Sequence, residues 1–183
     1  CEHSFPTRRS SDLIKAFPLI LMSHYTVMGS TTGNGEALFM NSDIVIPTAA
    51  LEASNYDLVC LGHIHKAQSI PNCGRPVYYS GTPNAISFNE EGQRKGFYIH
   101  DFDDESIQLN SKFINTPSRE FLTLNWDDEG VKEFIESGLN DNIWANLELV
   151  KEKIVRVIYS CSDELNKQFS KKSLEKALYA AGA

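Results

Sequence analysis

Two short apolar runs, each followed at once by histidine, limit the folds open to this chain. Residues 17–22 lead into Ser23 and His24, and residues 56–61 lead into Gly62-His63-Ile64-His65. Runs of this length are typical of buried strands in a parallel sheet. Because binding sites of open α/β sheets lie beyond the carboxyl ends of strands, we expect the three histidines to meet at one edge of a sheet.

The residue types at these strand ends indicate metal binding. Gly62 permits a sharp change of chain direction, so that His63 and His65 can both face one site. Neutral imidazole is a good ligand for first-row divalent metals. We therefore interpret His24, His63 and His65 as metal ligands. A lone strand-end histidine is more often hydrogen-bonded than metal-bound, and His100 is accordingly interpreted as a solvated strand end without a role.

The rest of the pattern predicts a mixed α/β chain with a domain boundary near residues 115–130. From residue 75 the chain becomes β-rich, and we expect antiparallel pairing there. The last helix has an apolar stripe, and Gly182 follows it where a left-handed cap belongs. Expected strands span residues 76–80, 96–102, 107–114, 120–126 and 154–159, and expected helices span 47–53, 128–137 and 171–181.

The first residues do not resemble a natural protein segment. Residues 3–12 read HSFPTRRSSD, which one reading frame of a common sequencing adapter oligonucleotide encodes, and Leu13 continues that frame. We expect residues 1–13 to be an artefact outside the fold, and natural sequence upstream of them to be missing.

Composition excludes several other classes of protein. A chain of 183 residues with 42% apolar residues can bury a core, and its net charge of -7 without a basic run argues against coating nucleic acid. Bound cations can still attract phosphate locally. The four cysteines form no C-x-x-C pair, which favours a reducing cytoplasm. No apolar run is long enough to span a membrane.

Several segments together resemble the SbcD family of calcineurin-like metallophosphoesterases. They are LILMSHYTVMG at residues 19–29, YDLVCLGHIHKAQ at 56–68, YYSGTP at 78–83, and SFNE at 87–90 with Lys95-Gly96. The G-H-x-H motif is shared by the wider superfamily, whereas the later segments are similar to its nuclease branch. The resemblance extends over nearly all of residues 17–183.

The resemblance implies a fold and a ligand set. Residues 14–120 would be the carboxy-terminal part of a four-layer α/β/β/α nuclease domain, and residues 121–183 a truncated α+β capping domain. Two divalent metals, manganese by preference, would bind there, with His24 and His63 on one ion and His65 on the other. The D-x-H, G-D and G-N-H-D motifs of the family are absent from this sequence, so we expect no catalytic residue here and no activity from this chain alone.

The function that the resemblance implies is phosphodiester hydrolysis at DNA ends, in DNA repair and recombination. The partners would be an SbcC-type, SMC-like ATPase and a second copy of the nuclease subunit. Two alternatives stay open: a phosphomonoesterase or cyclic-nucleotide phosphodiesterase of the same superfamily, and a non-enzymatic interaction module with structural histidines. The candidate substrate-binding residues are Lys66, Arg75, Tyr79, Ser80 and Gly81.

Overall fold

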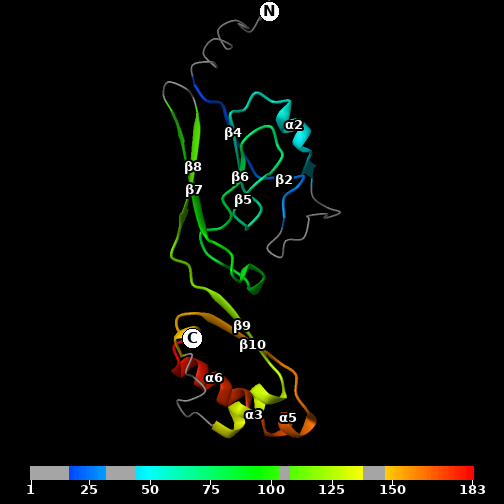
Figure 1. The fold of residues 1–183 in the computed structure, drawn as a ribbon, viewed down its shortest axis with the longest axis vertical. Helices are drawn as coiled ribbons and strands as arrows, with labels where there is room; N and C mark the ends of the chain where they lie inside the picture. Colours follow the sequence, from blue (N-terminus) through cyan, green and yellow to red (C-terminus); the bar gives the residue numbers. More distant parts are fainter. Residues whose placement is uncertain (1–16, 32–43, 104–107, 138–146) are drawn as a thin grey trace, which may run out of the picture. The chain divides into compact units, whose positions relative to one another are not determined.

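The structure is a computed structural model that describes residues 17–31, 44–103, 108–137 and 147–183. The chain divides into two compact units, which we describe separately: Cys1–Asn84 with Gln93–Pro117, and Ala85–Gly92 with Ser118–Ala183 (Figure 1). The expected artefact at residues 1–13 lies outside the described residues. The assignment of a nuclease part and a capping domain stays a prediction.

A four-stranded sheet forms the centre of the first unit. Its order is β1 (Ile20–Ser23), β4 (Leu58–Leu61), β6 (Val77–Tyr79) and β5 (Gln68–Ser69). β1, β4 and β6 are parallel, whereas β5 runs antiparallel to β6. The strands expected in the two apolar runs are therefore confirmed, and their carboxyl ends lie at the same edge of the sheet.

One face of this sheet carries the core of the first unit. Against it pack the helix α2 (Thr48–Glu52) and the strand β2 (Thr26–Val27), which pairs in parallel with β3 (Val45–Ile46). Burying a large aliphatic side chain contributes about 1.5–3 kcal/mol. The buried cluster consists of Val27, Leu51, Val59, Leu61, Ile64, Ile70, Val77 and Tyr79.

An antiparallel pair, β7 (Gly96–Phe102) and β8 (Leu109–Asn115), packs on the opposite face. Tyr78 alternates to that face and its ring centroid lies 4.9 Å from that of Tyr98 and 4.8 Å from that of His100. His100 is thus half-buried within β7, and burial lowers its pKa. Its interpretation as a solvated strand end is wrong, because the His100 ring stacks on that of Tyr98 and contacts that of Tyr78 at a tilt.

The second unit is built on a parallel pair, β9 (Phe121–Trp126) and β10 (Ile154–Tyr159). Apolar side chains of the helices pack against Trp126, Val157 and Tyr159 on one face of this pair. The helices are α3 (Asp128–Ser137), α4 (Leu147–Val150), α5 (Asp163–Gln168) and α6 (Lys171–Ala180) (Figure 1). The buried residues of this cluster are Val131, Phe134, Phe169, Leu174 and Ala177.

The other face of β9 is covered by the short 3₁₀ helix η1 (Phe88–Glu90). The ring centroid of Phe88 lies 4.8 Å from that of Phe121. The Glu91 carboxylate accepts hydrogen bonds from the Thr123 hydroxyl at 2.6 Å and from its N–H at 2.8 Å. These two bonds lower the pKa of Glu91.

The expected strand directions are partly wrong. β7 and β8 are antiparallel as expected, but β6 pairs in parallel with β4, and β9 pairs in parallel with β10. Residue alternation identifies a strand without identifying the strand that pairs with it. Here the pairing strands are determined by side-chain packing in the two cores.

The helix expected at residues 171–181 is confirmed as α6, and Gly182 has a φ of 87°. Among the described residues, no helix combines the length and apolar character that crossing a bilayer requires.

Candidate metal site at the ends of β1 and β4

Parallel pairing brings the two histidine-bearing strand ends side by side. Ser23, the last residue of β1, is the register partner of Leu61, the last residue of β4. The N–H of Gly62 donates to the Ser23 carbonyl oxygen at 2.9 Å, which extends the pairing by one residue. His24 and His63 therefore leave the sheet from adjacent positions.

The imidazole rings of His24 and His63 contact each other edge to face. Their centroids are 5.3 Å apart with an interplanar angle of 73°, and both residues are exposed. Gly62 makes room for this arrangement, because a Cβ there would lie 2.7 Å from His24 Nδ1. The Nδ1 edge of His24 thus faces the backbone of Gly62, which leaves Nε2 as its nitrogen farther from the sheet.

The backbone after β4 turns both histidines of the G-H-x-H motif outward. His63 has a φ of 89°, in the left-handed region that residues other than glycine seldom occupy. Such a conformation costs about 1–3 kcal/mol and is concentrated at functional sites. Ile64 is buried in the core with 6% of its surface exposed, whereas His63 and His65 on either side are exposed. Core packing of one isoleucine therefore sets the outward direction of its neighbours.

Two of the three predicted ligands are brought together in the structure. His65 is exposed on the same loop, but in the described part of the chain no group of three or more histidine, cysteine or acidic side chains is arranged to hold a metal ion. Two accessible imidazoles suit a first-row divalent cation and provide two of the roughly four to six ligands that it requires. The pair therefore fits part of a coordination shell, and the three-histidine set stays a prediction.

Two of the predicted substrate-binding residues are used within the first unit. Tyr79 is fully buried, and its hydroxyl donates to the Tyr25 carbonyl and accepts from the Val27 N–H, both at 2.8 Å. Burial raises the pKa of Tyr79. The Arg75 guanidinium donates to the Ser54 carbonyl at 2.6 Å. The Tyr79 hydroxyl thus fixes the backbone that follows His24, and the Arg75 guanidinium holds the backbone just after α2. Substrate binding by Tyr79 and Arg75 stays a prediction.

The other three predicted substrate-binding residues are half-buried. Ser80 and Gly81 directly follow β6, and Gly81 has a φ of 75°. Lys66 follows the G-H-x-H motif, and its Nζ lies 3.4 Å from the Thr31 hydroxyl. Substrate binding by Lys66, Ser80 and Gly81 stays a prediction.

Gln68 holds two loops of the first unit together, a role that the sequence pattern did not reveal. Its amide accepts from the Thr31 N–H at 3.0 Å and donates to the Thr31 carbonyl at 2.9 Å, as a neighbouring strand would. The same amide nitrogen donates to the Lys66 carbonyl at 3.2 Å. Gln68 thus ties the loop after β2 to the loop after β4. A polar residue in a two-residue strand gives no periodic signal from which this role could be predicted.

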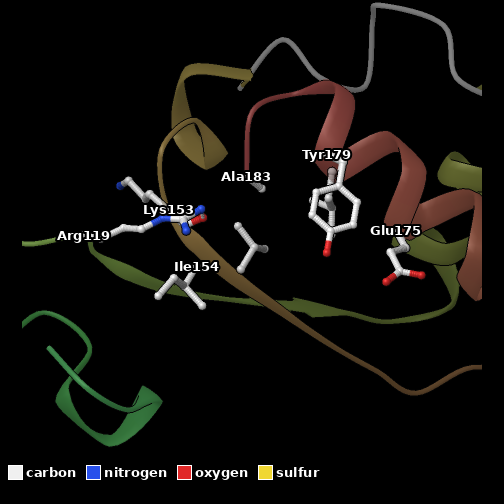
Figure 2. A pocket seen from close by; sticks show the side chains of 8 residues that line it. Arg119, Lys153, Ile154, Glu175, Tyr179 and Ala183 are labelled. Carbon is white, nitrogen blue, oxygen red and sulfur yellow. Dashed lines mark hydrogen bonds between the residues drawn. The ribbon is translucent and has the colours of Figure 1, made fainter.

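The second unit contains a separate open hollow with a volume of about 310 Å³. Figure 2 shows Glu175 and Tyr179 of α6 facing Arg119, Lys153 and Ile154 across it. The Arg119 guanidinium donates to two backbone carbonyls at 3.1 Å, and Lys153 forms an ion pair at 2.9 Å with Glu120. Both cations are therefore already engaged, and the residues that line the hollow provide no histidine or cysteine.

Comparison with known proteins gives one consistent group of relatives. The SbcD subunit of the SbcCD nuclease of Staphylococcus epidermidis is 31% identical over 113 residues, which are 61% of this chain. The SbcD subunits of Escherichia coli and Bacillus subtilis are 26% and 27% identical over 150 residues, which are 77% and 78% of the chain. The chain is a distant relative of the SbcD nuclease subunits. The resemblance expected from the sequence is thereby confirmed.

The SbcD relatives are much longer than the aligned segment. The aligned residues make up 29% of the Staphylococcus epidermidis SbcD and 36% of the Escherichia coli and Bacillus subtilis proteins, so the chain spans about a third of the length of the curated relatives it matches. No protein-family model matches the chain.

Proposed function

We propose that this chain is part of a nuclease subunit that hydrolyses DNA phosphodiesters at DNA ends with two divalent metals, manganese by preference. The observation that carries the proposal is the contact between the rings of His24 and His63 at the ends of two parallel strands. The relationship to SbcD nuclease subunits supports it. In this proposal the first unit is part of a four-layer α/β/β/α sandwich, and the second unit is a capping domain.

The residues of the chain would have separate roles. His24 and His63 would bind one ion, with His24 coordinating through Nε2, and His65 would bind the other. Bound divalent ions supply Lewis-acid stabilisation of the charge that develops on a phosphate during hydrolysis. The Lys66 ammonium and the backbone N–H groups of Ser80 and Gly81 would contact phosphate oxygens, which position a strand without reading its sequence.

The name of the relatives, which are one component of an SbcCD nuclease, supports the proposal of an SbcC partner. We propose an SbcC-type, SMC-like ATPase as the partner of the intact protein, with homodimerisation of the nuclease subunit. We propose a reducing cytoplasm as the compartment of the protein, because its four cysteines form no C-x-x-C pair.

Manganese titration of the 183-residue chain tests the site. We expect His24→Ala and His63→Ala each to weaken Mn²⁺ binding, measured by the electron paramagnetic resonance signal of free Mn²⁺. His100→Ala is the matched control, because it makes the same replacement in the same unit at a ring that packs against two tyrosines. Unchanged Mn²⁺ affinity in both site variants would favour the non-enzymatic module with structural histidines.

Activity measurements separate the remaining alternatives. We expect the 183-residue chain with manganese to leave an end-labelled duplex intact, because two adjacent imidazoles provide too few ligands for a metal pair. Robust shortening of the duplex by this chain would contradict that expectation. For the intact protein, faster hydrolysis of duplex ends than of a small aryl phosphate is expected, and the reverse preference would favour a phosphomonoesterase.

A further inference from the structure

Lys95 is a buried cation beside the candidate site. It immediately precedes β7, and only 5% of its surface is exposed. Its backbone is fixed by the Thr116 N–H, which donates to the Lys95 carbonyl at 2.9 Å. Lysine is almost never buried to this extent unless its ammonium group is paired, because removing the charge from water is costly. The acceptors of this ammonium group therefore indicate what the residue is for.

Two of the acceptors belong to the loops that form the site. Among its partners, the Lys95 ammonium donates to the carbonyl oxygen of His65 at 3.2 Å and to the hydroxyl of Thr82 at 3.0 Å, and another bond reaches the Gln93 side chain at 3.4 Å. His65 belongs to the loop after β4, and Thr82 to the turn after β6. One side chain from the start of β7 thus ties together two loops at the carboxyl edge of the sheet.

The carbonyl oxygen of His65 is enclosed from a second direction. The Thr82 N–H donates to it at 3.2 Å. Gly81 adopts a φ of 75°, and a Cβ at this residue would lie 2.6 Å from the same oxygen. The His65 carbonyl oxygen therefore accepts hydrogen bonds from the Lys95 ammonium and the Thr82 N–H, and the backbone of Gly81 packs directly against it.

We propose that Lys95 is a positioning residue for His65, acting through its main-chain carbonyl. Ile64 anchors the loop in the core on one side, and the Lys95 ammonium fixes the next peptide group, so the direction in which the His65 imidazole leaves the chain is set. This proposal rests on the proposed function only in that the imidazole so placed is a metal ligand. The positioning itself exists without metal.

The test compares Lys95→Met with Lys112→Met in the 183-residue chain. Methionine keeps an apolar stem of similar length and removes the ammonium group, and Lys112 is an exposed lysine of β8 in the same unit. Imidazole ¹H–¹⁵N spectra are recorded without metal. We expect the His65 signals to shift in Lys95→Met alone, with those of His24 and His63 unchanged. Unchanged His65 signals, or equal shifts of all three histidines, would overturn the proposal.

Manganese affinity gives a second readout. Disturbing a group that orients a metal ligand typically costs about tenfold or more in affinity, and we expect that loss in Lys95→Met and none in Lys112→Met. Wild-type affinity in a folded Lys95→Met would overturn the proposal. If the wild-type chain binds no Mn²⁺, the proposed function fails, and the metal-free spectra still decide the position of His65.

A charge-retaining variant keeps the test decisive if Lys95→Met does not fold. Lys95→Arg preserves the charge, but the wider, planar guanidinium cannot occupy the same point between the His65 carbonyl and the Thr82 hydroxyl. We expect the His65 signals to move in this variant too. Wild-type His65 signals in folded Lys95→Arg would overturn the proposal.

Discussion

Replacing Gly62 by alanine should disable the candidate metal site while leaving the fold almost unchanged. The new Cβ would lie 2.7 Å from Nδ1 and 3.4 Å from Cε1 of His24, so the imidazole has to move. His24 is exposed, and its ring can rotate into solvent without displacing backbone. Gly62 itself does not have a left-handed φ, so alanine is compatible with its backbone conformation.

The expected change in stability is small because two effects oppose each other. Forcing the His24 side chain off its preferred rotamer costs about 0.5–1.5 kcal/mol. Replacing glycine by alanine restricts the unfolded chain and contributes about 0.4–1 kcal/mol in favour of folding. The free energy of unfolding of Gly62→Ala should therefore stay within about 1 kcal/mol of wild type, whereas Mn²⁺ affinity should fall about tenfold or more.

Gly81→Ala is the matched comparison, with the same chemical change and the opposite outcome. Here the new Cβ would lie 2.6 Å from the His65 carbonyl oxygen and 2.7 Å from the Ala67 nitrogen, and both are backbone atoms. The φ of 75° adds about 1–2 kcal/mol for a residue with a side chain. Because the backbone must also shift, we expect Gly81→Ala to be destabilised by more than about 2 kcal/mol.

Urea unfolding followed by circular dichroism measures the stability of both variants, and electron paramagnetic resonance measures Mn²⁺ binding. The reasoning is refuted if Gly62→Ala binds Mn²⁺ as tightly as wild type, since displacement of His24 would then have no effect on the site. It is also refuted if Gly81→Ala is as stable as wild type, because the loops would then not be in the close contact described.

Three further predictions concern polar groups that are not among the proposed metal ligands. Tyr79→Phe removes the hydroxyl that pairs two backbone groups in the core, and we expect a loss of about 1–3 kcal/mol in urea unfolding; an unchanged midpoint would contradict the role assigned to that hydroxyl. The pKa of His100 is lowered from 6.5 by burial, so stability due to the neutral ring is present above pH 6.5 and lost at more acidic pH. His100→Gln should reduce this loss of stability at acidic pH in a series of unfolding curves. An unaltered loss would show that another group causes it. The Thr123 hydroxyl lowers the pKa of Glu91 from 4.5, so Thr123→Val should raise it, and a carboxylate titration by NMR that finds no rise would exclude this cause.

The sequence predicted the elements that place the histidines, because their signals are local. Apolar runs identified β1 and β4, and the apolar stripe with Gly182 after it identified α6. The proximity of His24 and His63 followed from parallel pairing, which was an inference from the composition of the two runs. The predictions of β1, β4 and α6 needed no knowledge of contacts between distant residues, whereas the proximity of the two histidines required one inferred strand pairing.

The parts that could not be predicted depend on long-range contacts. The sequence gives no indication that the Tyr79 hydroxyl reaches the backbone next to His24, more than fifty residues earlier, or that Gln68 pairs with Thr31. The two-residue strands β2, β3 and β5 are too short to show a period of two. The parallel partner of β9 follows it only after α3 and α4, so a pattern of short strands wrongly suggested an antiparallel neighbour.

Ile64 makes the spacing of the G-H-x-H motif a matter of folding as well as of binding. Inserting one residue between Leu61 and Ile64 would either draw an imidazole into the apolar interior or expel the isoleucine into water, and full exposure of that side chain costs about 1.5–3 kcal/mol. A library randomised over residues 62–65 and selected for folded protein alone should therefore retain an aliphatic residue at position 64. Selection for stability would thus keep the side chains at positions 63 and 65 directed toward solvent, even where no metal is required.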